Sequence, residues 1–291
     1  MKYLGELIKK QPCTWLEAAK KSKKENSQQF QELADSIAKS YDLYESLITS
    51  CDDELDESSF IEHSSLLIEY YEKAPKKLND YLLERRNEHE LSSCPYCGNP
   101  MYPDTLDHFV PKSKWPEFSI YPNNLVPQCR GCAPVKGENY FCHDNEQTMF
   151  IHPFYFNILE NFRFSMKVSF NTNKKEICVN VQLKEIINTR PEDQARIILH
   201  TQKLKVKKRI ISYCHKEYRQ WIRRLSNANF DIKSALTQRL TEVAELEVGR
   251  DWQSSFYSAI LDNEDVINHM NSFCQNEALS KKKKNGVYLD F

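Results

Sequence analysis

Two short cysteine motifs frame the stretch that decides the fold of this chain: Cys94-Pro95-Tyr96-Cys97 and Cys129-Arg130-Gly131-Cys132. The 31 residues between them, 98–128, contain Leu106-Asp107-His108-Phe109-Val110-Pro111-Lys112 and Asn123-Asn124-Leu125-Val126-Pro127. Two thiolate pairs supply the four ligands of tetrahedral zinc. The pattern therefore predicts a structural zinc site made by Cys94, Cys97, Cys129 and Cys132, with no coordination position left for chemistry.

Two other interpretations of the cysteines are unrelated pairs and a redox pair. A redox pair normally lies at a helix start beside a strand–helix–strand pattern, which this sequence lacks. Nine of the twelve prolines lie within residues 95–153, and helical periodicity disappears there. A small domain of this kind buries little apolar surface, so a metal is expected to hold it together.

The composition indicates a globular protein, with 40% hydrophobic and 28% charged residues in a chain of 291. We expect no membrane span, because no run of about 18 apolar residues occurs. We expect no signal peptide, because the first ten residues contain no apolar stretch of the required length. The six cysteines outside the two motifs are scattered, which favours a reduced, cytoplasmic setting over a disulfide framework.

Periodicity predicts an α+β fold in which a small zinc-clamped core and a β-hairpin are flanked by helical regions. A stripe of apolar residues predicts a long amphipathic helix: Phe30, Leu33, Ile37, Tyr41, Tyr44 and Ile48. Further helices are expected at 60–72, after Pro75, after Pro191 and at 232–248, and alternation predicts a hairpin over 162–183. The Lys281–Lys284 tract is expected to be a solvated or disordered end. The expected divisions are 1–90 (helical), 91–145 (zinc core), 146–183 (linker and hairpin) and 184–291 (helical).

The Asp107-His108 pair lies in a short alternating segment that is expected to form a strand, with the two side chains on opposite faces. Hydrolysis of a phosphodiester needs a cation to neutralise charge and a base to activate water. Asp is a hard oxygen ligand suited to Mg²⁺, and His titrates near neutral pH. Asn124 precedes a plausible return strand, where its amide could fix the loop or orient His108.

The combined pattern resembles the HNH endonuclease family, in the branch clamped by a four-cysteine zinc. The resemblance implies a ββα-metal core whose helix starts near Arg130. It implies that His108 is the general base, that Asp107 is a ligand of the catalytic Mg²⁺ or Mn²⁺, and that Asn124 is the structural asparagine. Pro111-Lys112 and Lys136-Gly137 match the family pattern too.

More loosely, such chains resemble HNH effector subunits of Septu-type or retron-linked anti-phage systems. That resemblance implies a separate ATPase partner, since this sequence has no Walker A loop.

Ala133 departs from the family pattern, in which an Asn or His after the last cysteine supplies a second metal ligand. A methyl group cannot bind a cation. The activity could have been lost naturally, a neighbour such as His143 or Asn139 could substitute, or the alanine could be a deliberate inactivating substitution. We favour the last, because every other motif position is intact.

The net charge is −1, but residues 201–224 contain nine Lys or Arg and one acid, Glu217. Local patches decide where a polyanion binds. The expected nucleic-acid contacts are Lys112, Lys136, Lys203, Lys207, Lys208, Arg219, Arg223 and Arg224. The sequence favours an endonuclease acting on DNA rather than RNA. Alternatives are a zinc-stabilised nucleic-acid- or protein-binding adaptor that has lost catalysis, and a restriction or homing enzyme that acts alone.

Overall fold

The computed structural model describes residues 1–171 and 176–274. The fold is α+β, and the described part contains ten α-helices and three two-stranded antiparallel sheets. The helices are α1 (Thr14–Lys20), α2 (Ser27–Thr49), α3 (Ser64–Glu72), α4 (Lys76–Asn87), α5 (Ala133–Lys136), α6 (Pro191–Lys203), α7 (Val206–Leu225), α8 (Ile232–Thr241), α9 (Trp252–Leu261) and α10 (Glu264–Asn271). The strands are β1 (Thr105–His108), β2 (Leu125–Gln128), β3 (Phe141–Cys142), β4 (Gln147–Thr148), β5 (Phe162–Asn171) and β6 (Glu176–Glu185).

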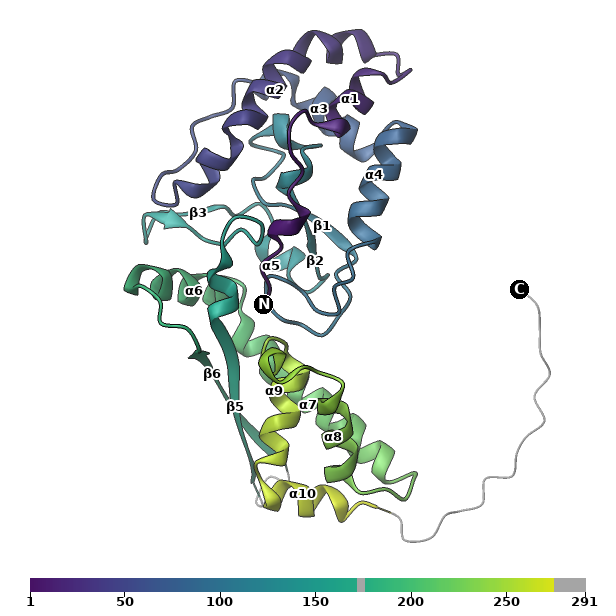
Figure 1. Cartoon of the computed structure of the whole chain (residues 1–291), viewed down its shortest axis with the longest axis vertical. Coiled ribbons are helices and arrows are strands. Elements are labelled where there is room, and N and C mark those ends of the chain that lie inside the picture. Colours follow the sequence, from purple (N-terminus) through teal and green to yellow (C-terminus); the bar gives the residue numbers. More distant parts are fainter. Residues whose placement is uncertain (172–175, 275–291) are drawn as a thin grey trace, which may run out of the picture.

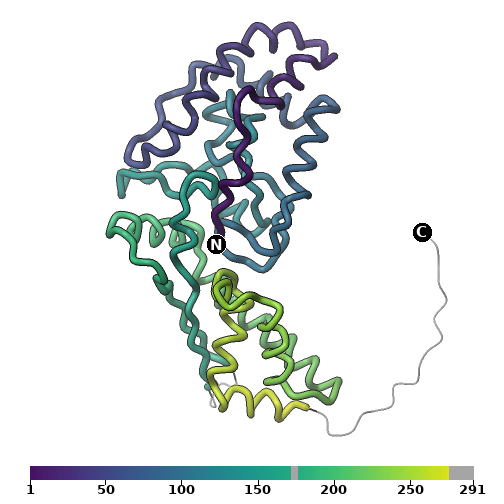
Figure 2. The backbone as a smooth tube through the Cα atoms, in the orientation of Figure 1, coloured from purple at the N-terminus to yellow at the C-terminus, as the bar shows by residue number. Residues whose placement is uncertain are grey.

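The elements gather in two halves that meet near the N-terminus (Figure 1). One half holds α1–α4 around the β1–β2 hairpin and α5, and the other holds the long β5–β6 hairpin with α7–α10. The backbone trace starts at the junction, and the first residues run from there up through the upper half (Figure 2). Within the described residues, no helix combines the length and apolar character needed to cross a membrane.

The long helix α2 confirms the predicted amphipathic stripe, and it carries the core of the upper half. Tyr41 and Tyr44 are buried and face the loop that joins β1 to β2. The Tyr41 ring stacks on Tyr121 with centroids 4.1 Å apart, and Tyr44 meets Phe118 edge-on at 4.9 Å. Aromatic pairs in these arrangements add to the stabilisation that burial gives. The helix therefore holds the loop that follows His108.

Antiparallel pairing of β1 and β2 sets Asp107 opposite Val126 and His108 opposite Leu125. The helix that follows begins at Ala133, not near Arg130, and lasts a single turn. The reason is local: residues 129–132 form a tight turn closed by the Cys132 amide, which donates to the Cys129 carbonyl at 2.9 Å. The helix can start only after this turn ends.

The β5–β6 hairpin confirms the predicted alternation, and the inward residues of β5 pack against α9. The predicted helix at 232–248 is wrong in its end, because α8 stops at Thr241 and a short 3₁₀ turn follows at Glu245–Glu247. Helices α9 and α10 lie in the region expected to be helical, but no individual helix was predicted at their positions. The basic segment 201–224 is not one helix either, since Lys205 has φ 52° and separates α6 from α7. The Lys281–Lys284 tract lies outside the described residues.

Candidate active site and metal centre

The four motif cysteines meet in one buried cluster. The Sγ atoms of Cys94, Cys97, Cys129 and Cys132 all lie within 4.8 Å of one another, and those of Cys97 and Cys129 are 3.8 Å apart. Sulfur atoms about 2.3 Å from a tetrahedral zinc lie about 3.8 Å apart, so the cluster has the dimensions of a structural zinc site. All four cysteines are free thiols and buried. The donor set fits zinc, and a bound ion would hold the two motifs together.

The cluster is surrounded by donors that the sequence did not identify. The guanidinium of Arg209, on α7, approaches Sγ of Cys132 at 3.3 Å and Sγ of Cys97 and Cys129 at 3.6 Å each. Burial opposes the charge of this guanidinium, yet the nearby thiolates outweigh that effect and raise the pKa of Arg209. Arg209 follows the buried Val206 by three residues, which places the two on one side of α7, and this spacing is a sequence signal that Arg209 faces inward.

Asp107 points into the protein. Its carboxylate accepts a hydrogen bond from the Tyr96 hydroxyl at 2.8 Å and pairs with Nζ of Lys136 at 3.1 Å. Burial raises the pKa of Asp107, against the opposing effect of Lys136. Each carboxylate oxygen thus already has a partner within the protein, and a cation bound to Asp107 would have to share an oxygen with Tyr96 or Lys136.

Lys136 is fully buried, so the prediction that it contacts nucleic acid is wrong. Besides its pair with Asp107, its ammonium donates to the carbonyls of His108 and Phe109 at 3.1 Å each. An ammonium with no exposed surface cannot reach a phosphate. Lys136 instead connects α5 to the end of β1.

His108 has one ring nitrogen committed and one free. Its Nε2 lies 2.9 Å from the carbonyl oxygen of Ser119. Because a carbonyl only accepts, Nε2 must carry the proton, and the neutral ring then has its lone pair on Nδ1. The structure records no hydrogen bond to Nδ1 among the described residues. The ring of Tyr71, from α3, meets His108 edge-on at 4.4 Å and helps to fix its plane.

The surroundings of His108 keep it neutral. Burial lowers the pKa of His108 from 6.5 to about 3, and the charges of Lys112 and Lys136 act in the same direction. The side chain keeps part of its surface exposed despite this environment. A neutral imidazole with a free Nδ1 has the lone pair that a general base needs, but a pKa this far below neutral pH makes it a weak base in the structure as it stands.

Three buried histidines use both ring nitrogens. His89, His152 and His200 each accept a backbone N–H at Nδ1, and each lies within hydrogen-bond distance of a backbone carbonyl at Nε2. These rings are structural. Unlike these three, His108 is half-buried and lines a cavity with a lone pair to spare on Nδ1.

Asn124 is fully buried and fixes the loop between β1 and β2. Its amide nitrogen donates to the carbonyls of Val110 and Phe118, and its amide oxygen accepts from the Val110 N–H at 2.8 Å and the Tyr44 hydroxyl at 2.7 Å. It does not touch the His108 ring. Of the two roles considered for Asn124, the geometry matches the loop-fixing one.

A small cavity of about 220 Å³ opens beside His108. Its lining includes Asp107, His108, Pro111, Lys112, Ala133, Gly137 and Glu138. The predicted position of the second metal ligand, Ala133, therefore does face the same space as Asp107 and His108. Neither His143 nor Asn139 lines it. His143 is exposed and pairs with Glu54 at 3.6 Å, and the Asn139 amide donates to the Lys136 carbonyl, so neither is placed to substitute.

The side chains around this cavity do not form a complete Mg²⁺ site. Such a site needs several oxygen ligands, and here Asp107 is already paired and Ala133 offers none. Among the described residues, one group of three or more metal-binding side chains converges, and it is the four-cysteine cluster already described. The exposed carboxylate of Glu138 borders the cavity without joining Asp107 in such a group.

Lys112 also borders the cavity, where it pairs with Glu72 of α3 at 2.6 Å and lies 5.6 Å from the centre of the Tyr71 ring. Helix α3 thus contacts a side chain that lines the cavity, without lining the cavity itself. On α7, Lys207, Lys208, Arg219 and Arg223 are exposed, as expected for a surface that contacts phosphates. Lys203 is half-buried, and Arg224 is exposed but stacks on Trp221 at 4.6 Å.

Comparison with known proteins gives one partial match. A segment of 61 residues is 43% identical to Protein ea31 of Escherichia phage lambda. It covers 21% of this chain and 20% of the phage protein, so the chain spans about a fifth of that relative. No family model matches the chain, and no solved structure matches it.

Proposed function

We propose that this chain is a nucleic-acid phosphodiester hydrolase of the HNH type, with His108 as its general base. The observation that carries the proposal is the free Nδ1 of His108 at the edge of a cavity that Asp107, Lys112 and Ala133 also line. The resemblance of residues 94–136 to the four-cysteine HNH branch supplies the reaction class.

In the proposed reaction, a water molecule in the cavity attacks the scissile phosphorus and Nδ1 of His108 accepts its proton. The bond from phosphorus to the leaving sugar oxygen breaks, and that oxygen takes a proton from solvent. The carbonyl of Ser119 fixes the tautomer, and Tyr71 fixes the ring plane. A positioned base of this kind contributes about 10²–10⁴-fold to a rate. Asn124 holds the loop that carries Ser119, so it would act through the position of that carbonyl.

The chain lacks a complete set of ligands for the cation that the proposed reaction needs. We infer that Ala133 stands where an Asn or His would join Asp107 in binding Mg²⁺ or Mn²⁺, and that the chain as it stands cuts poorly. The second candidate function, a zinc-stabilised binding adaptor, is favoured by the same alanine and by the Lys136 ammonium that holds Asp107. A pure adaptor, however, has no use for a neutral histidine with a free lone pair at a cavity.

The exposed face of α7 is the proposed nucleic-acid surface, with Lys112 nearer the cavity. Replacing Lys207, Lys208, Arg223 and Arg224 with Ala should weaken binding and flatten its salt dependence, because each lost phosphate contact reduces the slope. Measuring the dissociation constant for a DNA duplex across a salt series tests this. An unchanged slope would reject the assignment.

The proposal also includes DNA as the preferred substrate, an anti-phage role, an ATPase partner and a cytoplasmic setting. The first three rest on the resemblance alone.

The function is tested with plasmid DNA and single-stranded RNA in the presence of Mg²⁺ or Mn²⁺. We expect the Ala133→Asn variant to cut, since it adds an amide oxygen to the cavity beside Asp107, and the unchanged chain to cut far less. Equal cutting by both would mean that another residue completes the site. Binding without cutting by either variant would favour the adaptor.

A further inference from the structure

The first cysteine motif is held in place by hydrogen bonds that come from outside the β1–β2 hairpin. The backbone carbonyls from Pro95 to Cys97, and that of Gly98 directly after the motif, each accept a hydrogen bond from a distant part of the chain. The pairs are Lys2 N–H to Pro95, His200 Nε2 to Tyr96, Trp252 Nε1 to Cys97 and Trp252 N–H to Gly98, at 3.1, 2.7, 2.5 and 3.0 Å. Two of the donors belong to Trp252, the first residue of α9, and one belongs to α6. The C-terminal half is therefore built directly onto the motif.

Arg209 makes the matching contact from α7 to the sulfur atoms. Its guanidinium reaches three of the four thiols, and it lies 5.3 Å from the centre of the Trp252 ring. Four thiolates around one divalent cation leave a double negative charge, and a buried charge needs a partner. Arg209 is the cation that meets this charge from the C-terminal half.

Gly131 makes room for that contact. A Cβ atom at Gly131 would lie 2.6 Å from Nη2 of Arg209, too close for the present arrangement. Gly131 has no positive φ, so its backbone accepts alanine. The second cysteine motif therefore contains a small residue at the point where the guanidinium approaches.

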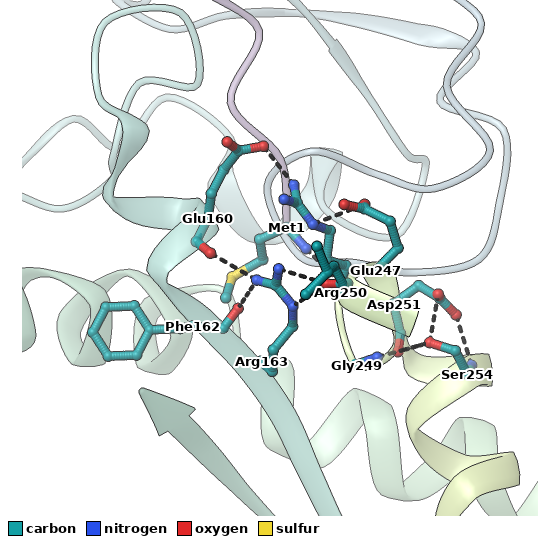
Figure 3. A network of polar contacts seen from close by, with 10 residues as sticks. Met1, Glu160, Phe162, Arg163, Glu247, Gly249, Arg250, Asp251 and Ser254 are labelled. Atoms are coloured by element: carbon teal, nitrogen blue, oxygen red, sulfur yellow. Dashed lines mark hydrogen bonds and ion pairs between the residues drawn. The ribbon is translucent and has the colours of Figure 1, made fainter. Parts of the chain in front are cut away.

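A polar network supports the same junction (Figure 3). The N-terminus of Met1 donates to the Arg250 carbonyl, and Arg250 pairs with Glu160 and Glu247. Asp251 caps α9 by accepting from the backbone N–H of Gln253 and Ser254 at 2.8 and 2.9 Å. This network fixes the start of α9, and with it the position of Trp252.

We propose that Arg209 is a positioning residue that docks α7 on the zinc–thiolate centre and so holds the basic face of α7 at a fixed place relative to His108. Trp252 and His200 set the orientation of the first motif, and Arg209 joins α7 to the sulfur atoms of the cluster. The claim that the position of α7 matters for the substrate rests on the proposed function. The docking of α7 on the thiolate centre does not.

Arginine suits this role better than lysine. Its planar fork presents several N–H groups at once and can reach three sulfur atoms, whereas an ammonium is a single compact charge. Partners that donate to metal ligands typically change metal affinity by about 10–100-fold when they are removed. Loss of Arg209 should therefore be visible in zinc retention, independently of any cutting.

The test uses the zinc-loaded full chain and its Arg209→Met, Arg209→Lys and Gly131→Ala variants. The rate of zinc transfer to a chromogenic chelator and the hydrogen–deuterium exchange of α7 are measured for each. We expect Arg209→Met to release zinc about 10-fold faster or more and to lose amide protection in the first turns of α7. Arg209→Lys should fall between it and the unchanged chain.

Gly131→Ala displaces the guanidinium without removing its charge, so it keeps the proposal testable if Arg209→Met fails to fold. It should raise the zinc release rate and the exchange of α7 in the same direction. Arg219→Met, on the exposed face of the same helix, is the matched control and should leave zinc release unchanged. Release and exchange at the unchanged rate in both Arg209→Met and Gly131→Ala would overturn the proposal, whatever the outcome of the nuclease assay.

Discussion

The thiolate centre and the cavity beside His108 lie a few residues apart in sequence. The centre has a complete set of ligand atoms, whereas the cavity does not. The centre has all its ligands buried together, every carbonyl of its first motif occupied and a guanidinium over its sulfurs. The cavity has a well-oriented histidine, the proposed base, but its carboxylate is held by Lys136 and Ala133 occupies the proposed position of the second ligand. The scaffold that orients His108 therefore does not depend on the residues that are proposed to bind the cation.

The reason is that the two regions contribute differently to stability. The cysteines are interior groups whose thiolates repel one another unless a cation or a proton intervenes. Ala133 is half-buried at a cavity wall, where neither its presence nor its replacement leaves a buried polar group without a partner. A change at the first region should therefore unfold the chain, and a change at the second should alter chemistry alone.

The largest effect should come from the thiolate centre. Cys94→Ser removes one of the four thiols that would bind zinc, and because metal binding and folding are coupled in such sites, we expect loss of the cooperative thermal transition and of bound zinc. Circular dichroism melting together with zinc analysis measures both. The exposed Cys178→Ser is the control and should melt as the unchanged chain does. A folded, zinc-free Cys94→Ser protein would show that the centre is not what holds the fold.

A smaller but still large effect is expected at Lys136, which pairs with the Asp107 carboxylate. Lys136→Met leaves the Asp107 carboxylate buried without its cation, and breaking a buried ion pair costs about 3–5 kcal/mol. The exposed Lys39→Met on α2 is the control.

The sign of the pH dependence follows from Asp107. Burial already raises the pKa of Asp107, and loss of Lys136 would raise it further. The penalty of Lys136→Met is therefore full above that pKa and shrinks as the pH falls and the carboxyl group becomes neutral. Urea denaturation at about pH 8 and about pH 5 measures it. An equal penalty at both would mean that the pair with Asp107 is not its source.

The smallest effect should come from Ala133→Asn, which we expect to change the free energy of unfolding by no more than about 0.5 kcal/mol, as for most changes away from the core. Urea denaturation of the zinc-loaded protein measures it. A loss of more than about 2 kcal/mol would mean that the cavity is packed for alanine, and it would count against Ala133 as a vacant ligand position.

Local patterns in the sequence predicted the parts that local patterns determine. The apolar stripe of α2, the alternation of β5 and β6 and the paired cysteines each carry their own signal. The end of α8 at Thr241 and the helices α9 and α10 were missed, because their packing on β5 and α7 is set by distant contacts. The site shows the same division. Proximity of His108 and Ala133 at one cavity followed from the motif, but the burial of Lys136 and the approach of Arg209 and Tyr71 come from elements far away in the sequence.

The central claim is that Nδ1 of His108 accepts the proton in phosphodiester cleavage, and single-turnover cleavage of plasmid DNA in the Ala133→Asn background tests it most directly. Adding His108→Ala should lower the rate by about 10²–10⁴-fold, whereas adding His143→Ala, an exposed histidine outside the cavity, should leave it unchanged. Cleavage at an undiminished rate without the His108 imidazole would contradict the account.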